Sequence, residues 1–163
     1  MELKKSVSNP MLVGSMELLK ADNTQNHLAM FLTELQKAEL LAPALIDPEP
    51  VEEEEGKQKI LPGSKVQFPM LSASDGNRYF MGFTDEGEYR LWEEKNRPCP
   101  TFALKFDDYI GMMMRKNADG KMSDAQGIVV NPYGANLVLH KDLLANLMAG
   151  RMIHFIRKQD DGK

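Results

Sequence analysis

Cysteine is nearly absent from this 163-residue sequence, because Cys99 is the only one and cannot form a disulfide within the chain. Long apolar runs are missing too. After Lys4 and Lys5, the only apolar run near the N-terminus is Met11-Leu12-Val13, far shorter than a signal-peptide core of about 7–15 residues. Nothing approaches the roughly 18 apolar residues of a membrane span. We therefore expect a cytoplasmic protein that does not enter a membrane.

An excess of positive charge is also lacking. The chain has 20 Lys and Arg against 24 Asp and Glu, which gives a formal net charge of -4. Proteins that bind nucleic acid through the phosphate backbone usually present a basic face, and attraction to anionic lipid also needs positive charge. The composition therefore disfavours nucleic acid and membranes as partners.

Motifs for chemistry are absent or incomplete. The three histidines, His27, His140 and His154, are scattered, and none has zinc-ligand spacing with Cys99. The glycine-rich phosphate loops and the G-x-S-x-G nucleophile motif do not occur. Cys99 lies between two prolines and no base for it is visible, which favours a structural or incidental cysteine. The sequence predicts no catalytic residue and no cofactor.

One segment partly matches a calcium-binding loop. Asn117, Asp119 and Gly120 stand at three of the expected places. However, Arg115 stands where the first carboxylate belongs, and Gln126 replaces the bidentate glutamate. A cation at the first ligand position repels calcium, so no metal site is predicted.

A helix is predicted over 24–41 from apolar residues that share one face, with Pro43 ending it. These residues are Leu28, Phe31, Leu32, Leu35 and Ala38. A short helix is predicted from Met16 to Lys20, and a final one from Leu143, Leu144, Leu147 and Met148. Asp85 is expected to cap another short helix, which holds Tyr89 and Trp92.

Acidic residues crowd the segment 47–59, which contains four consecutive glutamates. Burying these carboxylates unpaired would cost several kcal/mol each. We therefore expect a solvated, mobile loop inside the domain, because the strands that follow need partners.

Two hairpins are predicted beyond this loop. Asp75-Gly76 suits a two-residue connection, since glycine supplies positive φ at low cost. Asn131-Pro132-Tyr133-Gly134 matches the preferences of a type I turn. We expect Asn131 to be extended, since a proline follows it, and Gly134 to adopt a left-handed conformation.

The order of these elements predicts an α+β fold with a mixed, mostly antiparallel sheet of about five or six strands and helices packed on it. Residues 1–18 are expected to be an N-terminal extension and 19–150 the domain. Residues 151–163 could form a tail, an extra strand or a helix extension, and the sequence leaves the choice open.

The candidate interaction residues lie at the tip of the second hairpin. They are Asn131, Tyr133, Gly134 and Asn136. Tyrosine is a frequent anchor in protein interfaces. The alternative is that Tyr133 folds back over the sheet.

Three stretches together resemble a known family. They are FLTELQKAELLAPALI, FPMLSASDGNRYFMGFTDEGEYRLW and GIVVNPYGANLVLHKDLLANLM. They are similar to the N-terminal domain of SseB, the enhanced serine sensitivity protein family of bacteria, from about Leu19 to Gly150. The resemblance implies a bacterial, cytoplasmic α+β domain and supplies no catalytic residues.

The function expected is a non-enzymatic domain that binds another protein through the sheet edge or the tip around Tyr133. A homo-oligomer is left open. One alternative, which the family's name suggests, is a small-ligand sensor or enzyme related to amino acids. Another is a secretion-associated factor.

Overall fold

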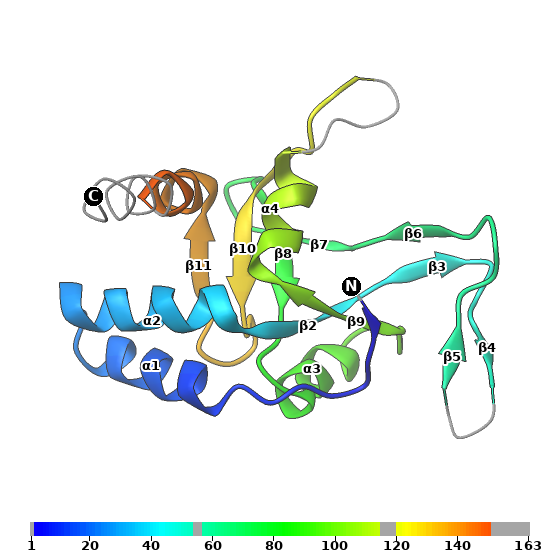
Figure 1. The fold of residues 1–163 in the computed structure, drawn as a ribbon, viewed down its shortest axis with the longest axis horizontal. Helices are drawn as coiled ribbons and strands as arrows, with labels where there is room; N and C mark the ends of the chain where they lie inside the picture. The colour runs from blue at the N-terminus through cyan, green and yellow to red at the C-terminus, as the bar shows by residue number, and fades with distance from the viewer. Residues whose placement is uncertain (1, 54–56, 115–119, 151–163) are drawn as a thin grey trace, which may run out of the picture.

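Two sheets form the centre of the fold (Figure 1). The computed structural model describes residues 2–53, 57–114 and 120–150. In the three-stranded sheet, β9 (Thr101–Lys105) pairs on either side with β1 (Glu2–Leu3) and β2 (Glu39–Pro43). The four-stranded sheet has the order β11 (Leu137–His140), β10 (Ala125–Val130), β8 (Arg78–Gly82) and β7 (Met70–Ser72).

The two sheets join where Leu41 of β2 forms a bridge with Phe83, which follows β8. The pair β8 and β10 is parallel, whereas the other pairs of both sheets are antiparallel. The predicted α+β class with a mixed, mostly antiparallel sheet is confirmed. The described strands outnumber the predicted five or six, because the two sheets together have seven, three plus four.

Helices cover both faces of the joined sheets. The larger core gathers residues from α1 (Pro10–Ala21), α2 (Gln25–Lys37), α4 (Phe106–Met114) and the final helical stretch 141–150. Phe80 of β8 belongs to this core, whereas Tyr79 and Met81 point to the opposite face. There they pack with Tyr89 and Trp92 of α3 (Glu86–Glu93). In the described ranges, no helix has the length and apolarity that a bilayer crossing requires.

The predicted helix over 24–41 is too long by four residues. It ends at Lys37, and Glu39–Pro43 form β2 instead. Leu40 and Ala42 point into the larger core and Leu41 into the smaller one, so this strand is buried on both faces. A short apolar run buried on both faces has no periodicity that separates strand from helix.

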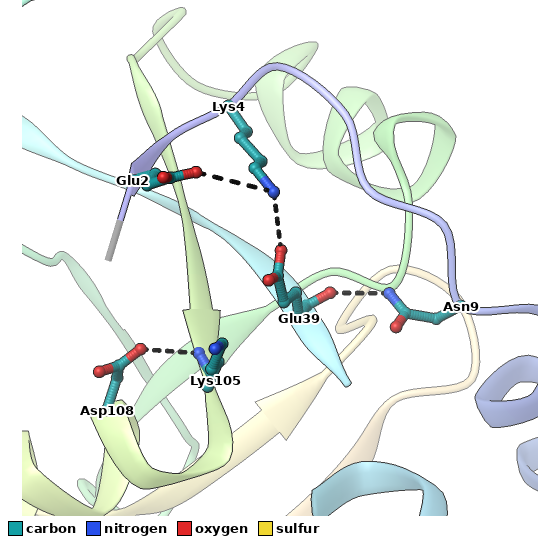
Figure 2. A network of polar contacts seen from close by, with 6 residues as sticks. All are labelled: Glu2, Lys4, Asn9, Glu39, Lys105 and Asp108. Carbon is teal, nitrogen blue, oxygen red and sulfur yellow. Dashed lines mark hydrogen bonds and ion pairs between the residues drawn. The ribbon is translucent and has the colours of Figure 1, made fainter. Parts of the chain in front are cut away.

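The first helix begins earlier than predicted, at Pro10, a residue favoured at the first helical position. Its Leu12 and Met16 lie in the larger core, so part of the segment expected as an N-terminal extension packs inside the domain. Figure 2 shows how the chain before this helix is fixed to β2. Lys4 Nζ lies 3.0 Å from Glu39 Oε2, and Asn9 Nδ2 donates to the Glu39 carbonyl at 2.7 Å.

A two-stranded ribbon projects from the body of the molecule (Figure 1). Its base pairs β3 (Leu45–Asp47) with β6 (Lys65–Gln67), and its outer part pairs β4 (Val51–Glu52) with β5 (Gln58–Lys59). Residues 51–53 are exposed, as expected for the acidic segment. Part of the segment expected as a solvated loop is paired in this ribbon, which keeps the carboxylates in water while the backbone groups still find partners.

The Asp75-Gly76 hairpin closes with three loop residues rather than two. Ala73 N–H donates to the Asn77 carbonyl at 2.8 Å, and Gly76 N–H donates to the Ala73 carbonyl at 3.0 Å. Gly76 has φ +85, so its predicted positive φ is confirmed. The Asp75 carboxylate accepts from Asn77 N–H at 2.9 Å, which favours this longer loop with a bulge.

Candidate functional site

The predicted turn at the end of β10 closes on the carbonyl of Asn131. Both Gly134 N–H and Asn136 N–H donate to this oxygen, at 2.9 and 2.8 Å. The turn itself is confirmed, but two details are wrong. Asn131 and Asn136 have positive φ, each 50, whereas Gly134 does not. Asparagine tolerates the left-handed conformation. With Asn131 and Asn136 in this conformation at the two ends of the turn, the Asn131 carbonyl accepts both hydrogen bonds.

Asn131 is a buried residue, 4% exposed. Its side-chain oxygen accepts from Thr84 N–H at 2.9 Å, and its side-chain nitrogen donates to Thr84 Oγ1 at 2.9 Å. Its own N–H donates to the Gly82 carbonyl at 2.9 Å. Asn131 therefore fastens the turn to the segment after β8, and its side chain does not contribute to a contact surface.

Thr84 connects this turn to α3. The Thr84 hydroxyl donates to Asp85 Oδ2 at 2.9 Å, and Asp85 Oδ1 accepts from Glu88 N–H at 2.9 Å. Asp85 is thus the N-cap of α3, as a carboxylate before a first turn suggests. The Thr84 carbonyl accepts from Asn9 Nδ2 at 2.8 Å. Every polar group of this fully buried threonine has a partner, so the turn and α3 are held in one arrangement.

The carboxylate of Glu88 packs against Gly134. A Cβ at position 134 would lie 2.6 Å from Glu88 Oε2, so only glycine leaves room for this contact. Glu88 Oε2 is buried without a hydrogen-bond partner among the described residues. Burial raises the pKa of Glu88, and the nearby negative charge of Asp85 raises it further.

Glu88→Gln is expected to stabilise the fold near pH 7, because the ionised carboxylate is disfavoured where it is buried. A raised folded-state pKa means that the folded wild type binds a proton more tightly than the unfolded chain. The wild type therefore gains stability as pH falls from the folded pKa of Glu88 towards its ordinary value of 4.5, and Glu88→Gln lacks this gain. Urea unfolding of both proteins at several pH values measures the difference. A difference that does not change with pH would contradict this role for Glu88.

Tyr133 stands on the outside of the same turn and is 40% exposed. Lys95 Nζ lies 5.2 Å from the centre of its ring, a cation–π distance, so the ring lies beside the end of α3 rather than back over the sheet. Gly134 and Asn136 are exposed as well. We call Lys95, Tyr133, Gly134 and Asn136 the turn surface.

The helix α3 presents further residues towards the turn surface. Glu88, Leu91 and Lys95 are spaced three and four residues apart, which places them on one side of the helix and its end. Leu91 is an exposed large apolar residue. The contributions of Thr84, Glu88 and Lys95 were not foreseen, and only the capping pattern of Asp85 gave any sequence signal for this junction.

The surroundings of Cys99 keep its thiol protonated. Burial raises its pKa, an effect that the nearby Arg97 opposes. The backbone around Cys99 is held by Tyr89, whose hydroxyl donates to the Cys99 carbonyl at 3.0 Å. Burial raises the pKa of Tyr89 to about 12. A protonated thiol is a poor nucleophile, so this arrangement favours a structural position for Cys99.

The remaining polar candidates lie apart from one another. His27 Nδ1 contacts the Asp22 carbonyl at 2.6 Å, and the ring of His140 accepts from Asp142 N–H at 3.2 Å. Within the described ranges, no three His, Cys, Asp or Glu side chains are grouped to hold a metal. His154 and the segments 115–119 and 151–163 lie outside the described residues.

A comparison with protein families finds a match to a family described as the SseB protein N-terminal domain, over residues 12–146. This match covers most of the chain, so the protein belongs to that family. The matched range contains α3 and the whole turn surface. It begins at residue 12, earlier than Leu19, where the resemblance was expected to start. No curated protein and no solved structure matches the chain.

Proposed function

We propose that this chain is a non-enzymatic protein-interaction domain that binds its partner through the turn surface. The observation that carries the proposal is an exposed tyrosine on a turn that is anchored from inside by the buried pair Asn131 and Thr84. An aromatic ring held in place before binding loses little conformational entropy on association. Tyrosine is also among the residue types that most often dominate binding energy.

The protonated state favoured for Cys99 supports a role without covalent catalysis. The cytoplasmic location expected from the sequence belongs to the same proposal. The proposal also includes that the partner is a protein, rather than nucleic acid or a membrane.

Tyr133→Ala is expected to remove a binding anchor and leave the fold intact, because the residue is 40% exposed and its ring lies beside the Lys95 side chain at the surface. The test is affinity purification from the native cell with the tagged full chain, quantified by mass spectrometry. Proteins retained by the wild type should be lost from Tyr133→Ala. Tyr133→Phe is the matched control, because it keeps the ring beside Lys95. Equal recovery of the same proteins by Tyr133→Ala would remove the turn surface from the account.

A further inference from the structure

A groove of about 990 Å³ lies on the other side of α3 from the turn surface. One wall is the ribbon strand β3, another is the segment 97–100, and α3 provides a third. Residues that line it include Ala44, Ile46, Tyr89, Glu93 and Cys99. This volume is at the upper end for ligand-binding pockets in proteins, about 300–1,000 Å³.

Along one side of β3, the edge of the strand in this groove has no paired strand among the described residues. Ala44 N–H donates to the Pro100 carbonyl at 2.9 Å, and this is the last bond between the β2–β3 strand and the segment before β9. Pro98 and Pro100 have no N–H groups, so the chain at 97–100 cannot continue the ladder along β3.

The backbone of Ile46 faces this open edge. Ile46 lies opposite Val66 of β6, but the backbone groups of successive residues point to alternate sides of a strand. Because Ala44 N–H points to Pro100, the N–H and C=O of Ile46 also face the β9 side, whereas those of Leu45 and Asp47 face β6. Within the described part of the chain, no backbone hydrogen bond joins Ile46 on the β9 side. Ile46 is only 7% exposed. Backbone N–H and C=O groups in so buried a residue normally have partners.

The carboxylate of Glu93 also lines this groove and has no direct ion-pair partner among the described residues, although Arg90 lies close enough for the charge of Glu93 to raise its pKa. Glu93 is close enough to Tyr89 and Cys99 for its charge to raise the pKa of both. By contrast, Glu86 on the same helix is paired with Arg90 at 2.7 Å. Among the residues that the structure describes, no lysine or arginine forms an ion pair with Glu93.

We propose that this groove binds an extended segment of another protein, which pairs with β3 through the N–H and C=O of Ile46 and places a lysine or arginine beside Glu93. The added strand would pair along the side of β3 where Pro98 and Pro100 prevent the segment 97–100 from pairing. Backbone hydrogen bonds to a strand edge supply affinity in this mode, and the side-chain contacts supply the preference for sequence. The groove is a second contact site, separate from the turn surface, and does not depend on Tyr133.

The test begins with a phage-displayed library of random dodecapeptides selected on the full chain. The selected peptides are expected to carry a basic residue and to slow hydrogen exchange of the Ile46 amide by about tenfold or more, measured by NMR on labelled protein. Glu93→Lys is expected to weaken their binding by about tenfold or more. The matched control Glu17→Lys makes the same charge change on the exposed side of α1 and should alter affinity by less than about twofold.

Several outcomes would overturn the proposal. They are selection of no peptide, selected peptides that leave Ile46 exchange unchanged, and equal weakening by Glu93→Lys and Glu17→Lys. Slow Ile46 exchange in the dilute free monomer would show that the chain itself covers the edge. Slowing that grows with protein concentration would point to a second copy instead. Tyr133 does not line this groove. Failure of the groove proposal would therefore not bear on the turn surface, which the Tyr133→Ala experiment tests separately.

Discussion

Asn131→Ala is expected to lower the free energy of unfolding by about 3 kcal/mol. The change removes both side-chain hydrogen bonds to Thr84 and leaves the buried Thr84 N–H without an acceptor, which costs about 1–3 kcal/mol. It also forces alanine into a positive φ of 50, which costs roughly 1–2 kcal/mol more. Urea unfolding measures the change, which corresponds to a fall in Tm of about 6–12 °C for a chain of this length.

Asn131→Gly separates the two contributions. Glycine adopts positive φ freely, so this variant should lose the hydrogen bonds alone and fall between the wild type and Asn131→Ala. If Asn131→Ala unfolds within about 0.5 kcal/mol of the wild type, the pair of Asn131 and Thr84 does not hold the turn.

Gly127→Ala is expected to destabilise the protein by about 4 kcal/mol, the larger of the two effects. Gly127 has φ +156, and a Cβ there would lie 2.0 Å from the backbone oxygen of Leu139 in the neighbouring strand. The position falls within a register shift between β10 and β8, and on its other side Gly127 pairs with His140 of β11. No side-chain rotation relieves a clash with a backbone atom, so β10 and β11 must move apart.

Gly111→Ala is the matched control. Gly111 lies within α4, and a Cβ there meets nothing within 4 Å. Alanine is the better helix former, so this variant should be more stable than the wild type by about 0.5–1 kcal/mol. Two glycine-to-alanine changes thus have opposite expected signs, and a similar loss in both would contradict the close approach at Gly127.

Local chemistry in the sequence predicted much of this fold. The cap at Asp85 and the closing residues of the Asn131 turn depend on side chains that bond to nearby backbone, so their patterns are visible without a structure. The final helical stretch 141–150 is likewise confirmed, with Leu144 in the larger core. By contrast, the first three residues of β2 were predicted as helix, because the neighbours of this strand, β9 and Phe83, lie far away in sequence.

The sequence predicted only part of the candidate site, because its other contacts join residues far apart in the sequence. Tyr133 is exposed at the tip, as an interaction residue must be, and its binding role stays a prediction. Asn131 was grouped with it by adjacency alone, yet its side chain turns inward to a threonine 47 residues earlier. The approach of Glu88 to Gly134 and the unpaired edge at Ile46 also depend on long-range packing, which no short pattern encodes.

The central claim is that two residues of one turn have different roles. The buried Asn131 holds the turn to Thr84, and the exposed Tyr133 binds a partner. The most direct measurement is the Kd of a purified partner recovered with the wild-type chain, compared between wild type and Tyr133→Ala. The account predicts a Kd raised by about 30-fold or more, as for a loss of about 2 kcal/mol at a dominant contact, with the unfolding free energy unchanged. An unchanged Kd in a stably folded Tyr133→Ala would contradict it.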